Sequence, residues 1–185
     1  SSAAQKGGRR DGLARLNDLP PKYSDTRDYP SIPSSMLSAH NHFGTVSIRE
    51  VYWAAVKKYG VSEIRDGGGF IRQLWWRDFN GHLMYAFEEL YSINPWEFDG
   101  PINLRGKTGE KEMRVFKAWC RGETGFDLVD AGMRSLLTTG FIHNRVRMVC
   151  ASWLVKDMGV WWRLGERWFA KHLVDYDPAQ NLMNW

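Results

Sequence analysis

The sequence predicts an all-α protein whose helices form an irregular or orthogonal bundle. From residue 47 onward apolar residues recur at helical spacing, whereas no stretch of useful length alternates as a β-strand would, and no internal repeat is present. The expected loops are long and the expected helices differ in length, which favours an irregular bundle over a four-helix bundle. A chain of 185 residues, 43% of them hydrophobic, is long enough for one compact domain with a large core.

Residues 1–45 are predicted to form an irregular basic arm. Four prolines interrupt any regular element there, and Ser, Asp and Asn are frequent. The first ten residues, SSAAQKGGRR, are small or basic and include no acid, as in the remnant of a processed organellar precursor, although an artificial boundary would look the same. We therefore expect an arm over residues 1–45 and a helical domain over residues 46–185.

A capping box marks the start of the first long helix. The Ser47 side chain can accept a hydrogen bond from the amide of Glu50 while the Glu50 carboxylate reaches back to the amide of Ser47. The helix is predicted to end at Gly60, because glycine favours the position just after a helix. After the glycine-rich residues 66–69, a second helix is expected over residues 70–91, where apolar side chains recur every three or four positions.

The second half of the chain is predicted to contain four further helices. Residues 92–110 are rich in Pro and Gly and are expected to form a loop. The remaining helices are expected over residues 112–121, 127–138, 144–158 and 162–173, and Gly140 and Gly159 are the stop signals of two of them. From residue 174 onward the sequence has no clear period.

The composition excludes several classes of protein. The formal net charge of +4 permits a polyanionic partner but does not require one. The best uncharged apolar stretch, residues 148–155, is far shorter than the ~20 residues of a membrane-spanning helix. Cys120 and Cys150 are too few for a disulfide scaffold, and His40 and His42 lack further ligands at zinc spacing, so no metal site is predicted. No G-x-S-x-G motif or phosphate-binding P-loop is present.

Asn144 and Arg147 are candidates for binding a ligand. They share a face at the start of an expected helix, which suits an anion or a polar ligand edge but would equally serve a cap and a salt bridge. The ten tryptophans of the chain leave a similar choice, because Trp can fill a core, stack on a planar ligand or carry electrons.

Two more polar clusters also have two explanations each. The run Asp175-x-Asp177-x-x-x-Asn181 could hold ribose hydroxyls or a purine amine, or it could be part of a polar tail. The run Ser34-Ser35-x-Leu37-Ser38 could bind a phosphate through hydroxyl and backbone N–H groups, or it could be an ordinary Ser-rich loop.

Six stretches follow one another along the chain, and together they resemble a known family. They are GGRRDGLARL, YSDTRDYP, SSMLSAHNHFGTVSIREVY, FIRQLWWRDF, AWCRGETGFDLVDAGMRSLLTTGFIHNRVRMVCASWLVKDM and WWRLGERWFAKHLVDYDPAQN. In this order they are similar to the FAD-binding helical domain of the photolyase/cryptochrome family. The resemblance extends from about Gly7 to Trp185 and is most specific over residues 124–158.

The resemblance implies FAD as the cofactor and assigns residues to it. In the family the Ser-rich run binds the diphosphate, the two aspartates bind the flavin ring or the ribose, and Arg147 would pair with a carboxylate. The expected cofactor-binding residues are Tyr23, Ser34, Ser35, Leu37, Ser38, Arg77, Asn144, Arg147, Asp175, Asp177 and Asn181.

The resemblance also implies a site for a flipped-out pyrimidine lesion in DNA. The expected catalytic residues are Gln73, Trp76 and Asn181, and Gln73 stands where dimer-repairing relatives have Glu. The expected DNA-binding residues are Arg27 and Arg145, with Arg9, Arg10 and Lys22 as further partners of phosphates. Relatives photoreduce their flavin through three tryptophans; Trp162 and Trp185 match two of them, and the third would fall near Gly109.

The chain departs from the family pattern in ways that lead to two hypotheses. Phe141 replaces the usual Trp, the family's AANN run has become Ala179-Gln180-Asn181-Leu182, and both the N-terminal α/β antenna domain and the last helices of the family domain lie outside this chain. One hypothesis is a degenerate domain without flavin that serves as a structural or interaction subunit of a larger organellar assembly of protein subunits, in a mitochondrion or plastid, with the nucleus or cytoplasm as alternative locations. The alternative is an FAD-dependent DNA photolyase or cryptochrome photoreceptor, so enzymatic activity stays open.

Overall fold

The computed structural model describes residues 5–61, 69–88 and 109–185 of this chain. Within these ranges the protein is helical and contains no β-strand, which confirms the predicted all-α class. The predicted loop over residues 92–110 and the glycine-rich residues 66–69 lie almost entirely outside the described residues.

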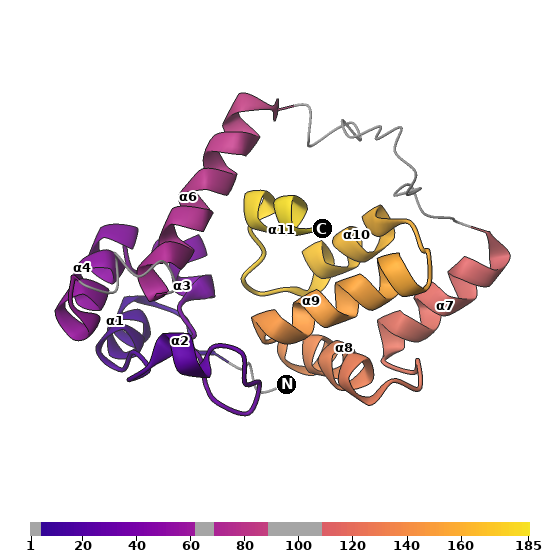
Figure 1. Ribbon diagram of the computed structural model, residues 1–185, viewed down its shortest axis with the longest axis horizontal. Helices are drawn as coiled ribbons and strands as arrows, with labels where there is room; N and C mark the ends of the chain where they lie inside the picture. Colours follow the sequence, from indigo (N-terminus) through magenta and orange to yellow (C-terminus); the bar gives the residue numbers. More distant parts are fainter. Residues whose placement is uncertain (1–4, 62–68, 89–108) are drawn as a thin grey trace.

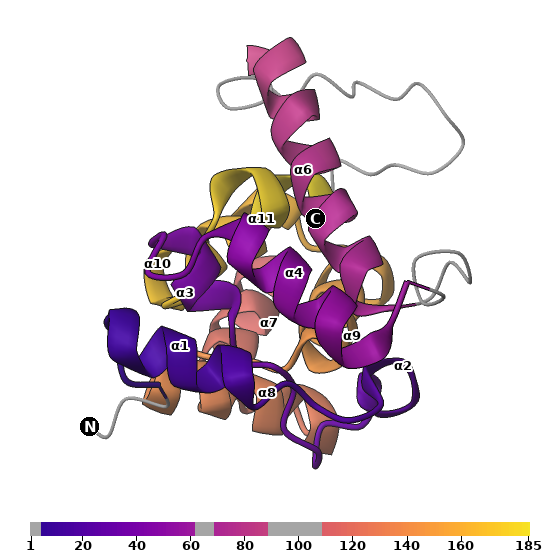
Figure 2. The same ribbon diagram turned by 90° about the vertical axis from the view of Figure 1, so that its left-hand side faces the viewer.

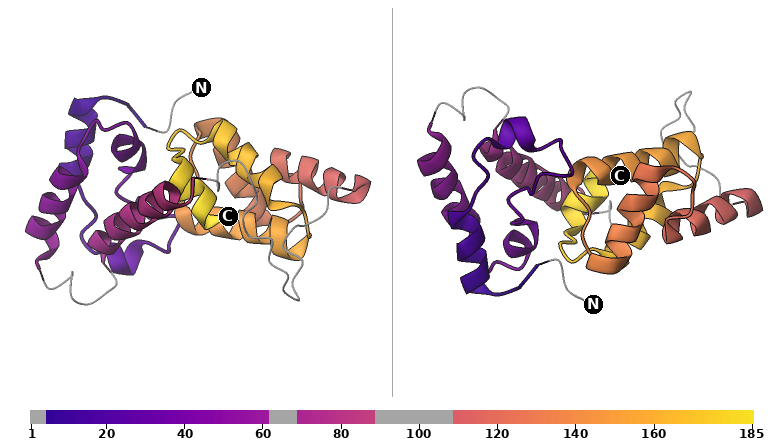
Figure 3. Two further views of the ribbon diagram at one scale, coloured as in Figure 1. Left: turned by 90° about the horizontal axis from the view of Figure 1, so that it is seen from above. Right: turned by 90° about the horizontal axis from the view of Figure 1, so that it is seen from below.

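The helices form two lobes that lie side by side in Figures 1 and 3. The first lobe contains α1 (Arg9–Asn17), α2 (Tyr23–Thr26), α3 (Ser38–His42), α4 (Ile48–Tyr59) and α6 (Phe70–Ala86). The second contains α7 (Glu110–Arg121), α8 (Asp127–Thr139), α9 (Asn144–Ser152), the π-helix η2 (Trp153–Asp157), α10 (Trp162–His172) and α11 (Pro178–Asn184). Figure 2 shows α6 extending beyond the rest of the first lobe.

Each lobe has its own hydrophobic core. The core of the first lobe includes Leu16, Leu37, Val51 and Ile71, and the core of the second is built around Trp119, which is fully buried. Burial of this apolar surface is the main force that stabilises the helices, because isolated helices of 9 to 17 residues are marginal in water. The two cores share no residue, and helices α6 and α11 make the main contact between the lobes.

Several helix ends confirm the sequence prediction. Ser47 and Glu50 form the expected capping box, with the Glu50 amide 3.2 Å from Ser47 Oγ and the Ser47 amide 2.8 Å from Glu50 Oε2. Gly60 ends α4 at a positive φ of 82°, and Gly140 ends α8 at 73°, a region that only glycine adopts without strain. Helix α6 ends at Ala86, earlier than the predicted residue 91.

The prediction of an irregular arm over residues 1–45 is wrong in part. Residues Arg9–Asn17 form a helix, α1, and Leu16, Leu19 and Leu37 are buried in the core of the first lobe. Gly12 lies on the buried face of α1, where an added Cβ would be 3.1 Å from Val46 Cγ1. Tertiary packing therefore supports a helix whose own sequence, with a central glycine, has weak helix propensity.

Two further differences lie near the C-terminus. The chain after residue 174 contains helix α11, which begins with Asp177 as N-cap and Pro178 in its first turn. Its seven residues are too few to show a period, although Asp followed by Pro is a start signal. The predicted helix over residues 144–158 is continuous, but its last turn is the π-helix η2.

We predict that Gly132→Ala destabilises the contact between α8 and α9. A Cβ at Gly132 would be 2.5 Å from Val146 Cγ1 and 2.8 Å from Cys150 Sγ, so two buried side chains must move. Overpacking of this kind should lower the free energy of unfolding by about 1–2 kcal/mol in urea denaturation. The matched control is Gly81→Ala on α6, where nothing lies within 4 Å and the higher helix propensity of Ala should stabilise the protein. Equal effects of the two changes would contradict the prediction.

Ionisation of Asp130 is expected to make the stability of the protein depend on pH in the acid range. Its carboxylate accepts hydrogen bonds from Thr124 N (2.7 Å), Thr124 Oγ1 (2.6 Å) and Gly125 N (3.0 Å). Burial opposes ionisation, but these hydrogen bonds outweigh it and hold the pKa of Asp130 below its ordinary value. Because the pKa is lower in the folded protein, ionised Asp130 stabilises the fold at pH values above its unfolded-state pKa of about 3.9. This stabilisation is lost as pH falls through the folded-state pKa.

We therefore expect Asp130→Asn to be less stable than the parent chain at pH 7, with a difference that shrinks below about pH 4. Urea denaturation of both proteins across this pH range measures it. A difference that stays constant from pH 7 to the acid limit would show that ionisation of Asp130 does not stabilise the fold.

Candidate functional site

A cavity of about 440 Å³ lies where α6, α9, α11 and the segment before α11 meet. From α6 it is lined by Gln73, Trp76 and Asn80, and the first turn of α9 contributes Asn144 and Arg147. The remaining lining residues are Arg27, Met148, Ala151, Phe169, Leu173, Asp175, Tyr176, Asp177, Gln180, Asn181, Asn184 and Trp185. Residues that are distant in sequence therefore surround one hollow of ligand-binding size.

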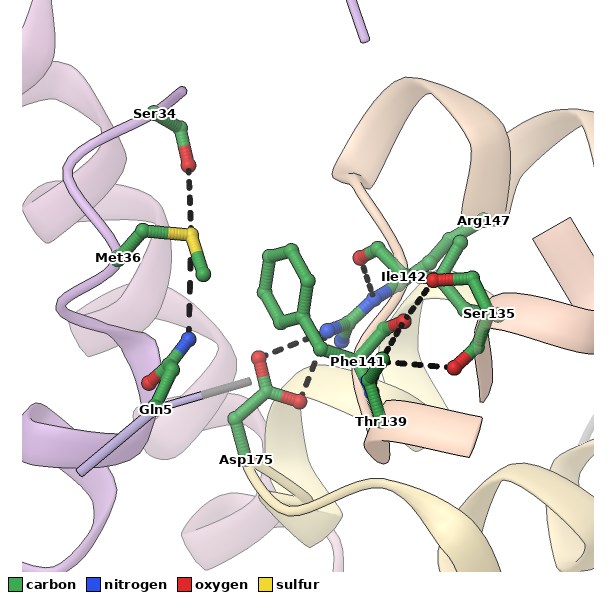
Figure 4. A network of polar contacts seen from close by, with 9 residues as sticks. All are labelled: Gln5, Ser34, Met36, Ser135, Thr139, Phe141, Ile142, Arg147 and Asp175. Atoms are coloured by element: carbon green, nitrogen blue, oxygen red, sulfur yellow. Dashed lines mark hydrogen bonds and ion pairs between the residues drawn. The ribbon is translucent and has the colours of Figure 1, made fainter. Parts of the chain in front are cut away.

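Arg147 and Asp175 form an ion pair on the wall of this cavity (Figure 4). Arg147 Nη2 donates to both carboxylate oxygens of Asp175 at 2.7 and 2.8 Å, and Arg147 Nε donates to the carbonyl of Ile142 at 2.9 Å. The Asp175 side chain is only 2% exposed, whereas that of Arg147 is 24% exposed. The guanidinium carbon also lies 5.6 Å from the centroid of the Phe141 ring. The predicted pairing of Arg147 with a carboxylate is confirmed.

Asn181 is held by partners at both ends of its amide. Its Nδ2 donates to Glu166 Oε1 at 3.2 Å, and its Oδ1 accepts from Trp185 Nε1 at 3.3 Å. Glu166 is buried and also accepts from the Tyr176 hydroxyl at 3.3 Å. These contacts fix one face of α11 toward α10 and place Asn181 and Trp185 on the cavity wall.

Asp177 positions the start of α11. Its carboxylate accepts from the amide of Gln180 at 3.1 Å, and its other oxygen lies 3.8 Å from His42 Nδ1. Because Asp177 caps the helix, the direction of α11 and of the side chains that follow is tied to this residue.

Comparison with known proteins identifies the family of this chain. A family model described as the FAD binding domain of DNA photolyase matches residues 70–185. The chain belongs to the photolyase/cryptochrome family. The resemblance read from the six sequence stretches is therefore confirmed.

Individual photolyases and cryptochromes are similar over nearly the whole chain. The deoxyribodipyrimidine photo-lyase of Agrobacterium fabrum is 44% identical over 88% of this chain and 33% of its own length. The cryptochrome DASH of Arabidopsis thaliana, named as chloroplastic/mitochondrial, is 34% identical over 97% of this chain. A crystal structure of a class III photolyase from Agrobacterium tumefaciens matches with a TM-score of 0.84 and 38% identity, and covers 98% of this chain and 38% of that one. The chain spans about a third of the length of its curated relatives.

Most of the photolyase-type residues predicted from the resemblance line the cavity. They are Arg27, Gln73, Trp76, Asn144, Arg147, Asp175, Asp177, Asn181 and Trp185. The structure thus brings the amide and guanidinium of α9 together with the Asp-rich run before α11. Spacing alone offers both a ligand-binding and a purely structural explanation for each of these clusters. The roles of these residues toward a cofactor or DNA stay predictions.

The residues expected at the diphosphate are not among the lining residues of this cavity. Leu37 is buried in the core of the first lobe, Ser38 begins α3, and Ser34 donates to Met36 Sδ at 3.8 Å. Figure 4 shows the Ser34–Met36 segment facing Phe141 and Asp175. Met36 has a positive φ of 54°, which is uncommon for a residue other than glycine and marks a tightly turned backbone.

The other predicted residues have structural partners. Tyr23 packs edge-on against Phe70 with ring centroids 5.0 Å apart, and the Arg77 side chain lies 3.8 Å from Asp78. Arg145 donates to Asp28 Oδ1 at 2.6 Å and lines a neighbouring, mostly apolar hollow of about 740 Å³.

The predicted electron-transfer residues take different positions. The Trp185 ring contacts Phe169 and Trp119 at centroid distances of 5.0 and 6.3 Å. Trp162 lies under the guanidinium of Arg163, and Gly109 is the N-cap of α7. Among the residues that the structure describes, no ring contact joins Trp162 to Trp185.

Sequence reasoning assigned no role to two residues of the cavity wall, Asn80 and Gln180. Both residues line the cavity, and Asn80 Nδ2 donates a hydrogen bond to Gln180 Oε1 at 2.8 Å. A signal existed for Asn80, which follows Gln73 and Trp76 by seven and four positions and so shares their helix face. Leu182, the last residue of the run that differs from the family's AANN, is not a lining residue of the cavity.

Both thiols are buried and poorly suited to nucleophilic chemistry. Burial raises the pKa of Cys120 and of Cys150 to about 12, so both are protonated at neutral pH. No cluster of three or more His, Cys, Asp or Glu side chains suited to a metal ion occurs in the described part of the chain. Within the same residues, no helix combines the length and apolarity of a membrane span.

Proposed function

We propose that the cavity between α6, α9 and α11 binds FAD and that the chain provides the flavin-binding part of a light-driven photolyase or cryptochrome acting on pyrimidine lesions in DNA. Of the two hypotheses drawn from the sequence, the proposal adopts the second, an FAD-dependent photolyase or cryptochrome. It is supported by family membership and by an archaeal photolyase from Sulfolobus tokodaii that is 42% identical with a TM-score of 0.81, whose structure is described as holding two FAD molecules.

The observation that carries the proposal is the set of polar groups around an open hollow. Asp175 is almost fully buried and paired with Arg147, and Asn144, Asp177 and Asn181 share the same cavity wall. Cavities and buried polar groups both cost stability. A domain with a purely structural role gains nothing from such a hollow, whereas a ligand that carries both aromatic rings and polar edges would fill it.

The chemistry of the lining residues fits a flavin nucleotide. Carboxylates and amides can accept from and donate to the polar edge of the ring and the ribose hydroxyls, the guanidinium of Arg147 favours an anionic group, and the rings of Trp76, Phe169 and Trp185 offer apolar contact. When bound, FAD supplies light absorption and electron transfer. The residues of this chain orient it, exclude water and hold the lesion, for which Gln73 and Trp76 on α6 are the candidates.

A structural or interaction role is the second candidate, and one observation favours it. Phe126, Leu128 and Met148 are each about half exposed and line the apolar hollow of about 740 Å³. Large exposed apolar patches commonly mark contact surfaces with another protein. Such a role is compatible with FAD binding, and it predicts partner subunits. The chloroplastic/mitochondrial Arabidopsis relative accords with an organellar location, which stays a prediction because other relatives are bacterial.

The absorption spectrum of the purified chain tests the proposal. We expect flavin bands in the isolated protein, or stoichiometric binding when FAD is added to colourless protein, with flavin fluorescence quenched by the nearby Trp76 and Trp185. A chain that stays colourless and does not bind added FAD, and that purifies in a stoichiometric complex without affinity for DNA, would overturn the proposal and favour the second candidate.

A further inference from the structure

The two lobes meet at a buried polar bridge between α6 and α11. The Asn80 side chain on α6 is buried, with 6% exposure, and its Nδ2 donates to Gln180 Oε1 at 2.8 Å. Gln180 Nε2 in turn donates to the carbonyl of Arg77 at 3.0 Å. Both ends of the Gln180 amide therefore bind α6, and loss of the Gln180 side chain would remove the acceptor of the buried Asn80 amide.

Other polar contacts between the lobes are more exposed. Asp28 and Arg145 are 53% and 41% exposed, and His42 and Asp177 are 30% and 20% exposed. Exposed ion pairs contribute little to stability because water and salt screen them. The Asn80–Gln180 bridge is thus the contact best suited to fix the position of α6 relative to α11.

This bridge lies between two groups of candidate functional residues. Gln73 and Trp76 precede Asn80 on α6, Asn181 follows Gln180 on α11, and Trp185 is the residue just after α11; all of them line the same cavity. A shift of α6 against α11 therefore changes the distance between the side of the cavity proposed for the DNA lesion and the side proposed for FAD.

We propose that Asn80 and Gln180 are positioning residues that couple binding of DNA at α6 to binding of FAD at α11. The inference rests on the proposed function.

Titration of FAD into the purified chain, with and without a single-stranded oligothymidylate that carries one cyclobutane dimer, tests the coupling. In the parent chain we expect the oligonucleotide to tighten FAD binding by about tenfold, within the usual range of coupling between two sites. Gln180→Ala should bind each ligand but reduce this factor to about one, because α6 no longer moves with α11. The exchange variant Asn80→Gln with Gln180→Asn keeps one amide on each helix and should restore the coupling.

The matched control is Asn184→Ala. Asn184 also lies on α11 and lines the cavity, but its Nδ2 donates to the backbone carbonyl of Gln180 rather than to α6. Its coupling factor should stay at the parental value. Coupling that persists in Gln180→Ala, or that falls equally in Asn184→Ala, would overturn the proposal.

A measurement without any ligand separates this inference from the proposed function. Amide hydrogen exchange of the flavin-free chain should be faster in α6 of Gln180→Ala than in the parent chain, and unchanged in Asn184→Ala. If the parent chain binds neither FAD nor the oligonucleotide, the proposed function is wrong. The hydrogen-exchange comparison would still show whether the Asn80–Gln180 bridge holds α6 in place. Unchanged exchange in Gln180→Ala would show that the bridge does not hold α6.

Discussion

Replacing Arg147 with alanine is expected to lower the free energy of unfolding by about 3 kcal/mol, because the change leaves the Asp175 carboxylate buried without its cation. The Asp175 side chain is 2% exposed, and both of its hydrogen bonds drawn in Figure 4 come from Arg147. The value is at the lower end for a broken buried pair since Arg147 itself keeps 24% exposure. Urea denaturation at neutral pH measures it.

The matched control for this change is Arg121→Ala. Arg121 also forms an ion pair, with its Nε 2.6 Å from Glu123 Oε2, but the two side chains are 57% and 55% exposed. We expect a change of at most about 1 kcal/mol there. If both variants lose the same stability, burial of Asp175 does not determine the strength of the Arg147 pair.

Arg147→Ala also separates the two functional hypotheses. If FAD is bound at this cavity, its affinity should fall by about 1–3 kcal/mol, because polar groups of the ligand lose a charged partner. Titration with FAD under conditions where the variant is folded gives this value. A variant with weakened stability but parental FAD affinity would place the flavin elsewhere.

Local sequence signals were sufficient for most helices of this fold. The capping box at Ser47 and the glycines at 60 and 140 are short-range features whose geometry depends on a few neighbouring residues, and the structure contains each of them. Helix α1 could not be predicted in the same way, since it forms where Leu16 packs into a core made by residues far along the chain. Tertiary contacts of that kind leave no local pattern.

The candidate site, like the fold, contains residues that local patterns could predict and contacts that they could not. Spacing could place Asn144 and Arg147 on one face of a helix, but only the resemblance connected them with Asp175, which lies 28 positions further along the chain. The resemblance in turn could not indicate the Asn80–Gln180 contact, because it assigned no role to either residue. Contacts between residues to which neither spacing nor resemblance assigns a role require the three-dimensional structure.

The Gly165→Ala variant should damage both the core of the second lobe and the cavity wall. A Cβ at Gly165 would overlap the Trp185 ring, with its Cζ3 atom only 2.6 Å away, and would lie 2.8 Å from Leu154 Cδ2. The ring cannot retreat into the core because Phe169 and the fully buried Trp119 pack against it at 5.0 and 6.3 Å. It must therefore move toward the cavity. We expect a loss of about 3 kcal/mol in the free energy of unfolding, at the upper end for overpacking.

A double-mutant cycle distinguishes this steric effect from a general intolerance of α10 to change. Phe at position 185 lacks the ring atoms that a Cβ at residue 165 would meet, so Gly165→Ala should cost much less in a Trp185→Phe background than in the parent chain. FAD affinity should follow the same order, since Trp185 lines the cavity. Additive effects of the two substitutions would mean that the Trp185 ring is not what limits the side chain at position 165. Because a glycine here lets an indole lie directly against a helix backbone, the shape of the proposed flavin site depends on the absence of a single methyl group.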